Sequence, residues 1–378
     1  NAGVWDSLTI ASGGIATLDN VTISNAKSCM IIDGVLSAKS LTVEDCLIGI
    51  EVSGTADISG LSVESVDNDG VRVSGAATLS QVDILYATAG ISSSGDLVVT
   101  EGEFQQVGTG VSLDGGTADI EGLDFISGVG NAVSIASNVS GDIDGMTGTS
   151  GNSIVAIDST GFQISNINMS GKRLVNSWSA GDLTISNATY FADSSETPID
   201  LRTSGTVALS EISLTGQFST FQGSYSAPWI GIAIAGSGDY LISDSHIEAT
   251  DYAVKASGTG TLSVSDTVFL SENNGLSFSG ISQTTLDNVT LNISQGGESG
   301  IDILQGAHSF SGLEVNMPFN QYATGSTGIE AWWCSIDSQN ITVTGFANSF
   351  SVYESYLSAE DLHPVSYTHL RAHETRGN

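Results

Sequence analysis

The sequence predicts an all-β protein that folds as a right-handed parallel β-helix, a solenoid of about fifteen coils with about 20–22 residues in each coil. The phrases GIEVSG, GVRVSG, GISSSG and GVSLDG recur along the chain at a nearly constant spacing, and they close on Gly54, Gly75, Gly95 and Gly115. Apolar and polar residues alternate in short runs between these phrases, which is typical of strands. The right hand follows from the strong bias of parallel crossover connections.

The strands can be assigned in chain order from these alternating runs. Residues 1–34 contain SLTI, GIATLDNVTIS and CMIIDG, and residues 35–137 contain the most regular coils, with Ala56, Ile58, Leu61 and Val63 as one inward-facing set. Residues 138–205 continue with looser punctuation, and regular coils resume at 231–236, 252–258 and 275–280. Units this short cannot bury an apolar face alone, so the coils must stack to form a core.

Two insertions widen the coil in the second half of the chain. The first, GQFSTFQGSYSAPW, lies between Leu214 and Ile232, and the second lies between Val315 and Ile329, four coils later at the same phase. Aromatic rings can stack on the apolar faces of sugars while their polar edges stay hydrated. The rings could instead fill a locally wider coil. We expect the following aromatic residues of these loops to bind a ligand: Phe218, Phe221, Tyr225, Trp229, Phe319 and Tyr322.

In its period and alternation, most of the segment from residue 10 to 360 resembles the pectin-lyase-like β-helix superfamily. An antiparallel sandwich array would need a longer period, and a propeller would need about 40 residues for each blade. The resemblance implies the fold more strongly than an activity, because one fold serves many functions. The NTD, DD, GHG and RIK blocks of the β-helix polygalacturonases are absent.

The cations that could serve as a lyase base do not stand in a matching motif: Arg72, Lys172, Arg173, Arg202 and Lys255. His246 and His308 are isolated in the sequence, and we expect both at the surface rather than as catalytic bases. A hydrolase would need two carboxyl groups at a defined separation, and a chain with 42 acidic residues produces such pairs by coincidence. No catalytic residue is therefore assigned from the sequence.

The composition limits the partners. The chain has 378 residues and a net charge of −33, which disfavours nucleic acid and anionic membranes and attracts divalent cations. No apolar run is long enough for a transmembrane helix. Three cysteines make no disulfide framework. Cys29 and Cys46 fall on adjacent coils about three residues out of phase by strand alignment, which allows a bridge between them without favouring it.

Strand alignment places three carboxylates at one outward position on successive coils: Asp83, Glu103 and Asp124. Like charges about 5 Å apart repel each other, so something must offset them. Calcium binds oxygen ligands and would do so, which makes the three residues a candidate metal site. Screening by water and salt is the alternative.

Seven asparagines stand in N-x-[ST] sequons, which fit a glycosylated exterior protein: Asn20, Asn138, Asn168, Asn187, Asn288, Asn292 and Asn340. Four of them, Asn20, Asn187, Asn288 and Asn340, share nearly the same phase of the coil. They could equally form a ladder of turns in which side-chain amides satisfy backbone groups.

The last residues differ from the rest of the chain. Residues 365–378 have no alternation, and VSYTHLRAHET resembles the in-frame translation of a sequencing adapter, so we treat them as a non-native tail and exclude His369 and His373 from any metal site. We expect residues 1–363 to form a single β-helix domain, a fragment that is open at both ends and lacks further domains of the same chain.

The sequence favours a non-enzymatic, secreted or cell-surface repeat protein, similar to an adhesin or a stalk, that displays loops for binding a polysaccharide or a cell-surface glycan. The alternative is a carbohydrate-active enzyme, a polysaccharide lyase or a glycoside hydrolase, acting along the same face. No cofactor is required, and calcium is the one metal that the composition suggests.

Overall fold

A computed structural model describes residues 5–136, 138–157, 161–178, 181–216, 229–295, 299–317, 325–365 and 371–372. Every regular element in these residues is a strand, so no helix there could cross a membrane. The chain divides into two compact units, residues 1–184 and residues 185–378. Each unit is a parallel β-solenoid, which confirms the predicted fold class.

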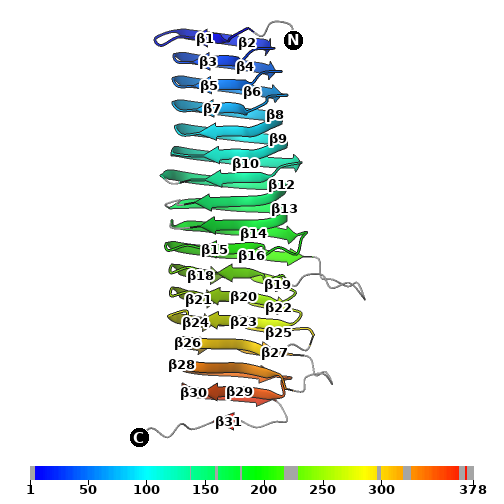
Figure 1. Cartoon of the computed structure of the whole chain (residues 1–378), viewed down its shortest axis with the longest axis vertical. Coiled ribbons are helices and arrows are strands. Elements are labelled where there is room, and N and C mark those ends of the chain that lie inside the picture. Colours follow the sequence, from blue (N-terminus) through cyan, green and yellow to red (C-terminus); the bar gives the residue numbers. More distant parts are fainter. Residues whose placement is uncertain are drawn as a thin grey trace. The chain divides into compact units, whose positions relative to one another are not determined.

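In the first unit the strands stack one coil upon the next (Figure 1). They are β1 (Leu8–Ile10), β2 (Ile15–Ser24), β3 (Ser28–Ile32), β4 (Val35–Glu44), β5 (Ile48–Val52), β6 (Thr55–Glu64), β7 (Asp69–Val73), β8 (Ala76–Ser93), β9 (Asp96–Leu113), β10 (Gly116–Ser127), β11 (Asn131–Ile135), β12 (Val139–Ile157) and β13 (Phe162–Trp178).

The second unit repeats this plan with shorter strands in its first half. They are β14 (Leu183–Ala192, which begins at the boundary), β15 (Ile199–Arg202), β16 (Thr206–Gly216), β17 (Ile232–Ile234), β18 (Asp239–Ser243), β19 (His246–Ala249), β20 (Tyr252–Ser257), β21 (Thr261–Ser265), β22 (Val268–Ser271), β23 (Asn274–Ser279), β24 (Gln283–Asp287), β25 (Thr290–Ile293), β26 (Ser299–Ser311), β27 (Glu314–Asn316), β28 (Thr327–Thr344), β29 (Asn348–Tyr353), β30 (Tyr356–Val365) and β31 (Arg371–Ala372).

Each strand pairs in parallel with the equivalent strand one coil later. In the first unit Val35 pairs with Thr55, Thr55 with Ala76, and Ala76 with Asp96. The step from one partner to the next is nearly constant over these coils and stays within the predicted range. Because the same register holds from coil to coil, equivalent side chains stack at about 4.8 Å along the direction of pairing.

One residue in each coil bends the chain between two inward-facing strand segments. This residue has a positive φ in eight coils of each described unit, for a total of about sixteen coils: Asn20, Ser40, Gly60, Gln81, Glu101, Gly122, Gly145, Asn166, Asn187, Glu211, Asp244, Asp266, Asn288, Gly312, Asn340 and Asp361. The left-handed region disfavours most residues and tolerates Gly, Asn and Asp. Asn20, Asn187, Asn288 and Asn340 therefore occupy one ladder of bends, while the satisfaction of backbone groups by their amides stays a prediction.

The side-chain amide of Asn288 shows what such a residue does. Its Nδ2 donates a hydrogen bond to Oδ1 of Asp266, the equivalent residue one coil earlier, over 2.7 Å. The amide is thus already engaged in linking two bends. This contact accounts for an asparagine at this position without invoking a glycan, and glycosylation of the sequons stays a prediction.

The core consists of columns of inward-facing apolar side chains. Ala56, Ile58, Leu61 and Val63 are all buried, as the alternation predicts. The rings of Phe104 and Phe125, one coil apart, stack with centroids 5.4 Å apart. The alternation in the sequence is therefore a direct record of which side chains fill the coil.

The recurring glycines mark a corner at which successive coils approach too closely for a side chain. A Cβ atom on Gly54 would lie 2.1 Å from the carbonyl oxygen of Gly34 on the preceding coil. The same holds for Gly75 and Gly95, but the fourth member is Gly116, whose Cβ would meet the oxygen of Gly95 at 2.1 Å. The sequence repeat identified Gly115 as that member, which is wrong by one position because this coil is slightly longer before the corner.

The two insertions connect equivalent strands, as predicted. Leu214 lies in one column with Ile247, Phe269, Leu291 and Val315. The chain returns after each insertion in a second column, from Ile232 through Val254, Leu276 and Ile301 to Ile329. The insertions therefore start and end at the same phase, four coils apart.

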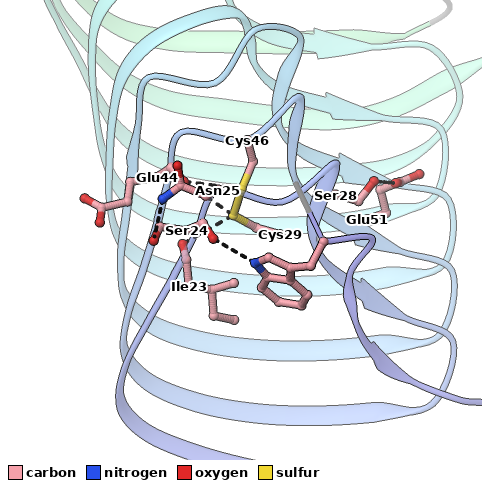
Figure 2. Close-up of a disulfide and its surroundings, with 9 residues drawn as sticks. Ile23, Ser24, Asn25, Ser28, Cys29, Glu44, Cys46 and Glu51 are labelled. Atoms are coloured by element: carbon pink, nitrogen blue, oxygen red, sulfur yellow. Dashed lines mark hydrogen bonds between the residues drawn. A yellow bond between two sulfur atoms is a disulfide. The ribbon is translucent and has the colours of Figure 1, made fainter. Parts of the chain in front are cut away.

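Cys29 and Cys46 form a disulfide in the first unit, with their Cα atoms 5.8 Å apart (Figure 2). The sequence did not favour this bridge because the two positions are out of phase. Their phase is as expected, since the residue in register with Cys29 is Gly49. Both side chains are buried, however, and they lie at a corner of the coil. At a corner, two residues that are not register partners can still come close enough to bond. The third cysteine, Cys334, is buried and unpaired with another thiol.

We expect the double substitution Cys29→Ala with Cys46→Ala to destabilise the first unit by about 3 kcal/mol, because the bridge closes a loop between residues separated by 17 positions. Guanidinium unfolding of the variant and of the wild type measures the change. A reductant should lower the stability of the wild type to that of the variant and leave the variant unchanged. Equal stability of the two proteins in the absence of reductant would show that the bridge contributes nothing.

Candidate functional site

Five of the six aromatic residues that the sequence assigns to ligand binding lie outside the described residues: Phe218, Phe221, Tyr225, Phe319 and Tyr322. The sixth, Trp229, is only 4% exposed. Its backbone N–H donates to Oγ1 of Thr250 over 2.8 Å, and its ring occupies the space beside Gly216. Trp229 is therefore a core residue and offers no ring face to a sugar, as the core-filling alternative anticipated for it.

The three carboxylates of the proposed metal column lie in register, as expected. Asp83 pairs with Glu103, and Glu103 pairs with Asp124. They border a shallow hollow of about 370 Å³ whose floor includes Gly102. Next along the column, Oγ1 of Thr147 donates to Oδ1 of Asp124 over 2.9 Å.

The carboxylates of this column follow one another along the coils instead of converging on a point. Within the described ranges, no group of three or more His, Cys, Asp or Glu side chains could hold a metal ion. The hydroxyl of Thr147 offsets part of the negative charge at Asp124, and screening by water and salt stays the alternative for the rest of the column. Calcium at Asp83, Glu103 and Asp124 stays a prediction.

His308 is not at the surface, which corrects the expectation from sequence. It is 3% exposed and lies between Phe278 and Phe310, with ring centroids 6.4 and 6.3 Å away. Its Nε2 donates to the backbone oxygen of Gln305 over 3.0 Å, while Nδ1 has no hydrogen-bond partner among the described residues. Burial lowers the pKa of His308, and the hydrogen bond to Gln305 offsets part of this effect. The residue is inward-facing because it shares a column with Thr284 and Ile336.

The partly exposed His246 and two of the arginines are engaged with carboxylates. His246 lies 3.5 Å from Glu248, and Arg202 makes two hydrogen bonds of 3.0 Å with the buried carboxylate of Asp200. Arg72 donates to Asp69 over 2.7 Å. Arg72 and Arg202 are therefore held in ion pairs and His246 lies against a carboxylate, so none of the three stands out as a catalytic base.

A different group of aromatic residues is exposed on the second unit. Trp332 and Trp333 are 36% and 54% exposed, and half-buried Tyr353 lies one coil later. The rings of Trp332 and Tyr353 stack at a centroid distance of 3.9 Å and an interplanar angle of 14°. Trp333 tilts by 56° from Trp332 with centroids 5.9 Å apart. We call Trp332, Trp333 and Tyr353 the aromatic corner.

The backbone explains why these rings face outward. Trp332 and Tyr353 are register partners on β28 and β29, so they share one outward column. The following position begins a corner, and it has a positive φ in four successive coils, at Gly280, Gln305, Trp333 and Glu354. The left-handed conformation costs roughly 1–2 kcal/mol for a residue with a Cβ. A bulky residue there is uncommon, and Trp333 gains little burial in return.

A groove of about 410 Å³ adjoins the aromatic corner. Its side chains come from two outward columns. One column runs from Ser277 through Asp302 to Glu330, and the other runs from Ser279 through Leu304 to Trp332. The groove therefore has hydroxyls at one end, two carboxylates along its length and an indole ring at the other end.

Two carboxylates orient the indoles of the aromatic corner. Nε1 of Trp332 donates to Oε1 of Glu330 over 3.1 Å, and Nε1 of Trp333 donates to Oε2 of Glu354 over 2.6 Å. These charge-assisted bonds fix the edges of both rings. Because the stack with Tyr353 covers one face of the Trp332 ring, a ligand can contact only the exposed remainder of that ring and the exposed surface of Trp333.

Sequence reasoning missed this site because it assigned the aromatic residues inside the insertions and left the pair that follows them. The spacing of the aromatic residues along the chain was the signal that could have revealed the site. Trp332 and Tyr353 are separated by the length of one regular coil, so both had to lie in one column. Asp302 and Glu330 were obscured because the second insertion makes the coil between them longer than the repeat period.

Comparison with known proteins yields little. No family model matches the chain, and no curated protein matches it. The resemblance to the pectin-lyase-like superfamily therefore stays a prediction.

Solved structures with some likeness include a mutant tailspike protein of E. coli bacteriophage HK620 in complex with a hexasaccharide, with 10% identity over 95% of this chain and 73% of that chain and a TM-score of 0.35. The receptor-binding domain of the siphovirus 9NA tailspike has 12% identity over 99% of this chain and 74% of that chain and a TM-score of 0.26. TM-scores this low do not establish a shared overall fold, and the fold described above rests on this chain's own strand pairings.

The buried imidazole of His308 predicts an acid-sensitive stability. Because its pKa is lowered in the folded state, the unfolded chain binds the extra proton first as the pH falls below about 6.5, and stability is lost from there down to the folded-state pKa. We expect His308→Leu to flatten the fall in melting temperature between about pH 6.5 and 5.5. The matched control, Thr284→Val in the same inward column, should keep the wild-type slope, because it removes no titratable group. A His308→Leu protein with the wild-type slope would contradict the assignment.

Proposed function

We propose that this chain is a surface-displayed β-solenoid that binds an oligosaccharide in the groove beside the aromatic corner. The observation that carries the proposal is the exposed stack of Trp332 on Tyr353 at the end of a groove lined by hydroxyls and carboxylates. The role does not require catalysis. The solenoid supplies a rigid surface that holds the ring and the polar groups at fixed spacing.

The aromatic residues fit the apolar faces of pyranose rings. Sugars present C–H groups on their faces, and an exposed indole or phenol ring can stack on them while its polar edge remains hydrogen-bonded. In the aromatic corner both indole N–H groups are already bonded to carboxylates, so stacking needs no rearrangement of the tryptophans. Preorganised rings reduce the entropy that binding would otherwise cost.

The remaining lining fits the hydroxyl groups of a sugar. Asp302 and Glu330 offer acceptor oxygens, and Ser277 and Ser279 offer hydroxyls that donate and accept. These four side chains lie on adjacent coils, so their spacing follows the strand separation of about 4.8 Å. In an oligosaccharide that lies along the groove, each sugar unit could contact one coil of the solenoid.

The disulfide and the charge support an exterior location. Disulfides persist in oxidising compartments and are rare where thiols are kept reduced. The Cys29–Cys46 bridge therefore favours a secreted or cell-surface protein, and the net charge of −33 suits a soluble exterior surface.

The alternative is a glycoside hydrolase that uses the same groove. Asp302 and Glu330 are register partners on adjacent coils beside the aromatic corner, and the carboxyl groups of retaining glycosidases are about 5–5.5 Å apart. A hydrolase would need a pair of carboxylates beside the aromatic residues. The sequence did not reveal such a pair, and Asp302 with Glu330 is one. Release of new reducing ends from a polysaccharide distinguishes the hydrolase from the display protein.

We expect Trp332→Ala to weaken binding of an oligosaccharide by about five- to thirtyfold, because a lost stacking ring costs roughly 1–2 kcal/mol. Calorimetric titration measures binding, and the same incubation is assayed for new reducing ends. The melting temperature should change little, because the ring is already 36% exposed.

The matched control is Trp178→Ala, since Trp178 is 45% exposed on the first unit. This variant should bind as the wild type does. A loss of melting temperature in Trp332→Ala with unchanged binding would assign the ring to the core and contradict the proposal.

A further inference from the structure

We infer that the oligosaccharide site continues past the aromatic corner onto the next face of the coil, where a second hollow around Tyr356 holds the other end of the same ligand. This inference rests on the proposed function and extends its site. It concerns the length and the path of the ligand, and it makes no claim about the ligand's charge. The ligand is a linear oligosaccharide that crosses the corner instead of ending at Trp332.

The second hollow has a volume of about 380 Å³ and lies on the strand segments that follow the corner. Hydroxyl, amide and carboxylate groups line it, and such groups donate and accept the hydrogen bonds that sugar hydroxyls form. Its outward-facing side chains belong to two columns, one from Gln283 through Ser335 to Tyr356 and the other from Ser309 through Asp337 to Ser358. We call it the Tyr356 hollow.

The ring of Tyr356 is available for stacking. Tyr356 is 69% exposed, and it makes no ring contact or hydrogen bond with the residues that the structure describes. The carboxylate of Asp337 is also exposed, and within the described ranges it forms neither a hydrogen bond nor an ion pair. A sugar can therefore stack on the Tyr356 ring and hydrogen-bond to Asp337 without breaking a contact that the fold uses.

Only a short turn of chain separates the aromatic corner from the Tyr356 hollow. Ser335, which lines the hollow, follows Trp332 by three residues, so the Cα atoms of the two residues lie at most about 10 Å apart. Trp333 occupies the corner between them and is 54% exposed. A sugar chain can bend at each glycosidic linkage, so a chain that leaves Trp332 can pass Trp333 and reach Tyr356.

The exposed rings on the two sides of the corner occur in neighbouring coils. An exposed ring adds little to the core, so the fold does not explain why both columns become aromatic at the same level of the solenoid. A ligand that contacts both sides explains it. Over the preceding coils both columns contain small, polar or aliphatic residues: Gln283, Ala307 and Ser335 before Tyr356, and Ser257, Ser279 and Leu304 before Trp332.

Calorimetric titration of the full chain, together with native mass spectrometry to count bound ligands, tests the inference. The probes are the linear hexasaccharides of glucose, N-acetylglucosamine and galacturonic acid. We expect the probe that binds to occupy each chain as a single molecule, because one ligand fills both hollows. Tyr356→Ala should weaken its binding by about five- to thirtyfold, as Trp332→Ala does. The melting temperature should change little, because Tyr356 is largely exposed.

Two further variants control for the ring itself. Tyr356→Phe keeps the stacking face and should retain the wild-type affinity within about threefold. Phe191→Ala removes another ring of the second unit, which is 42% exposed and lies outside both hollows, and this variant should bind as the wild type does. A loss of affinity in Phe191→Ala equal to that in Tyr356→Ala would overturn the inference.

The remaining outcomes separate the inference from the proposed function. Wild-type affinity in Tyr356→Ala, with weaker binding in Trp332→Ala, would overturn the inference and leave the proposed function standing. Two hexasaccharides bound to each chain would show two independent sites and would overturn the inference in the same way. Absence of binding by all three hexasaccharides would overturn both.

Discussion

The structure of each unit depends on one constraint, the register that pairs every strand with its equivalent one coil later. The register gives the backbone groups of a strand their partners, and it places equivalent side chains on top of each other at the strand spacing. Apolar residues therefore have to recur at the same position of each coil, as Phe104 and Phe125 do. Bends and corners must recur as well, so the left-handed backbone conformation is repeated at equivalent positions of successive coils.

The same constraint organises the candidate site. A column faces either the core or the solvent along its whole length, so functional groups on neighbouring coils line up without any dedicated loop. Asp302 beside Glu330 and Leu304 beside Trp332 form the groove in this way. At the corner that follows, Gln305, Trp333 and Glu354 occupy a left-handed position that Gly280 occupies two coils before Trp333, and Trp333 is the bulkiest of them. Strain of this kind is tolerated where the residue serves a purpose other than folding.

Much of the fold could be predicted from the sequence, because periodicity and alternation are direct consequences of the register. The coil length, the inward set around Ile58 and the common phase of both insertions are confirmed for this reason. The disulfide and the buried histidine were missed because they depend on which side chains come close at a corner or inside the coil. Cys29 meets Cys46 across a corner despite their different phases, and His308 points inward because of its column. The aromatic corner was missed for a further reason, since an insertion before it conceals the register that aligns Asp302 with Glu330.

The central claim is that the aromatic corner is present for binding and not for stability, and Trp333→Asn tests it most directly. Asparagine tolerates the left-handed conformation and keeps a side chain at the corner. The account predicts a melting temperature equal to or above that of the wild type, together with weaker binding of an oligosaccharide. A lower melting temperature with unchanged binding would show that Trp333 stabilises the fold and would contradict the account.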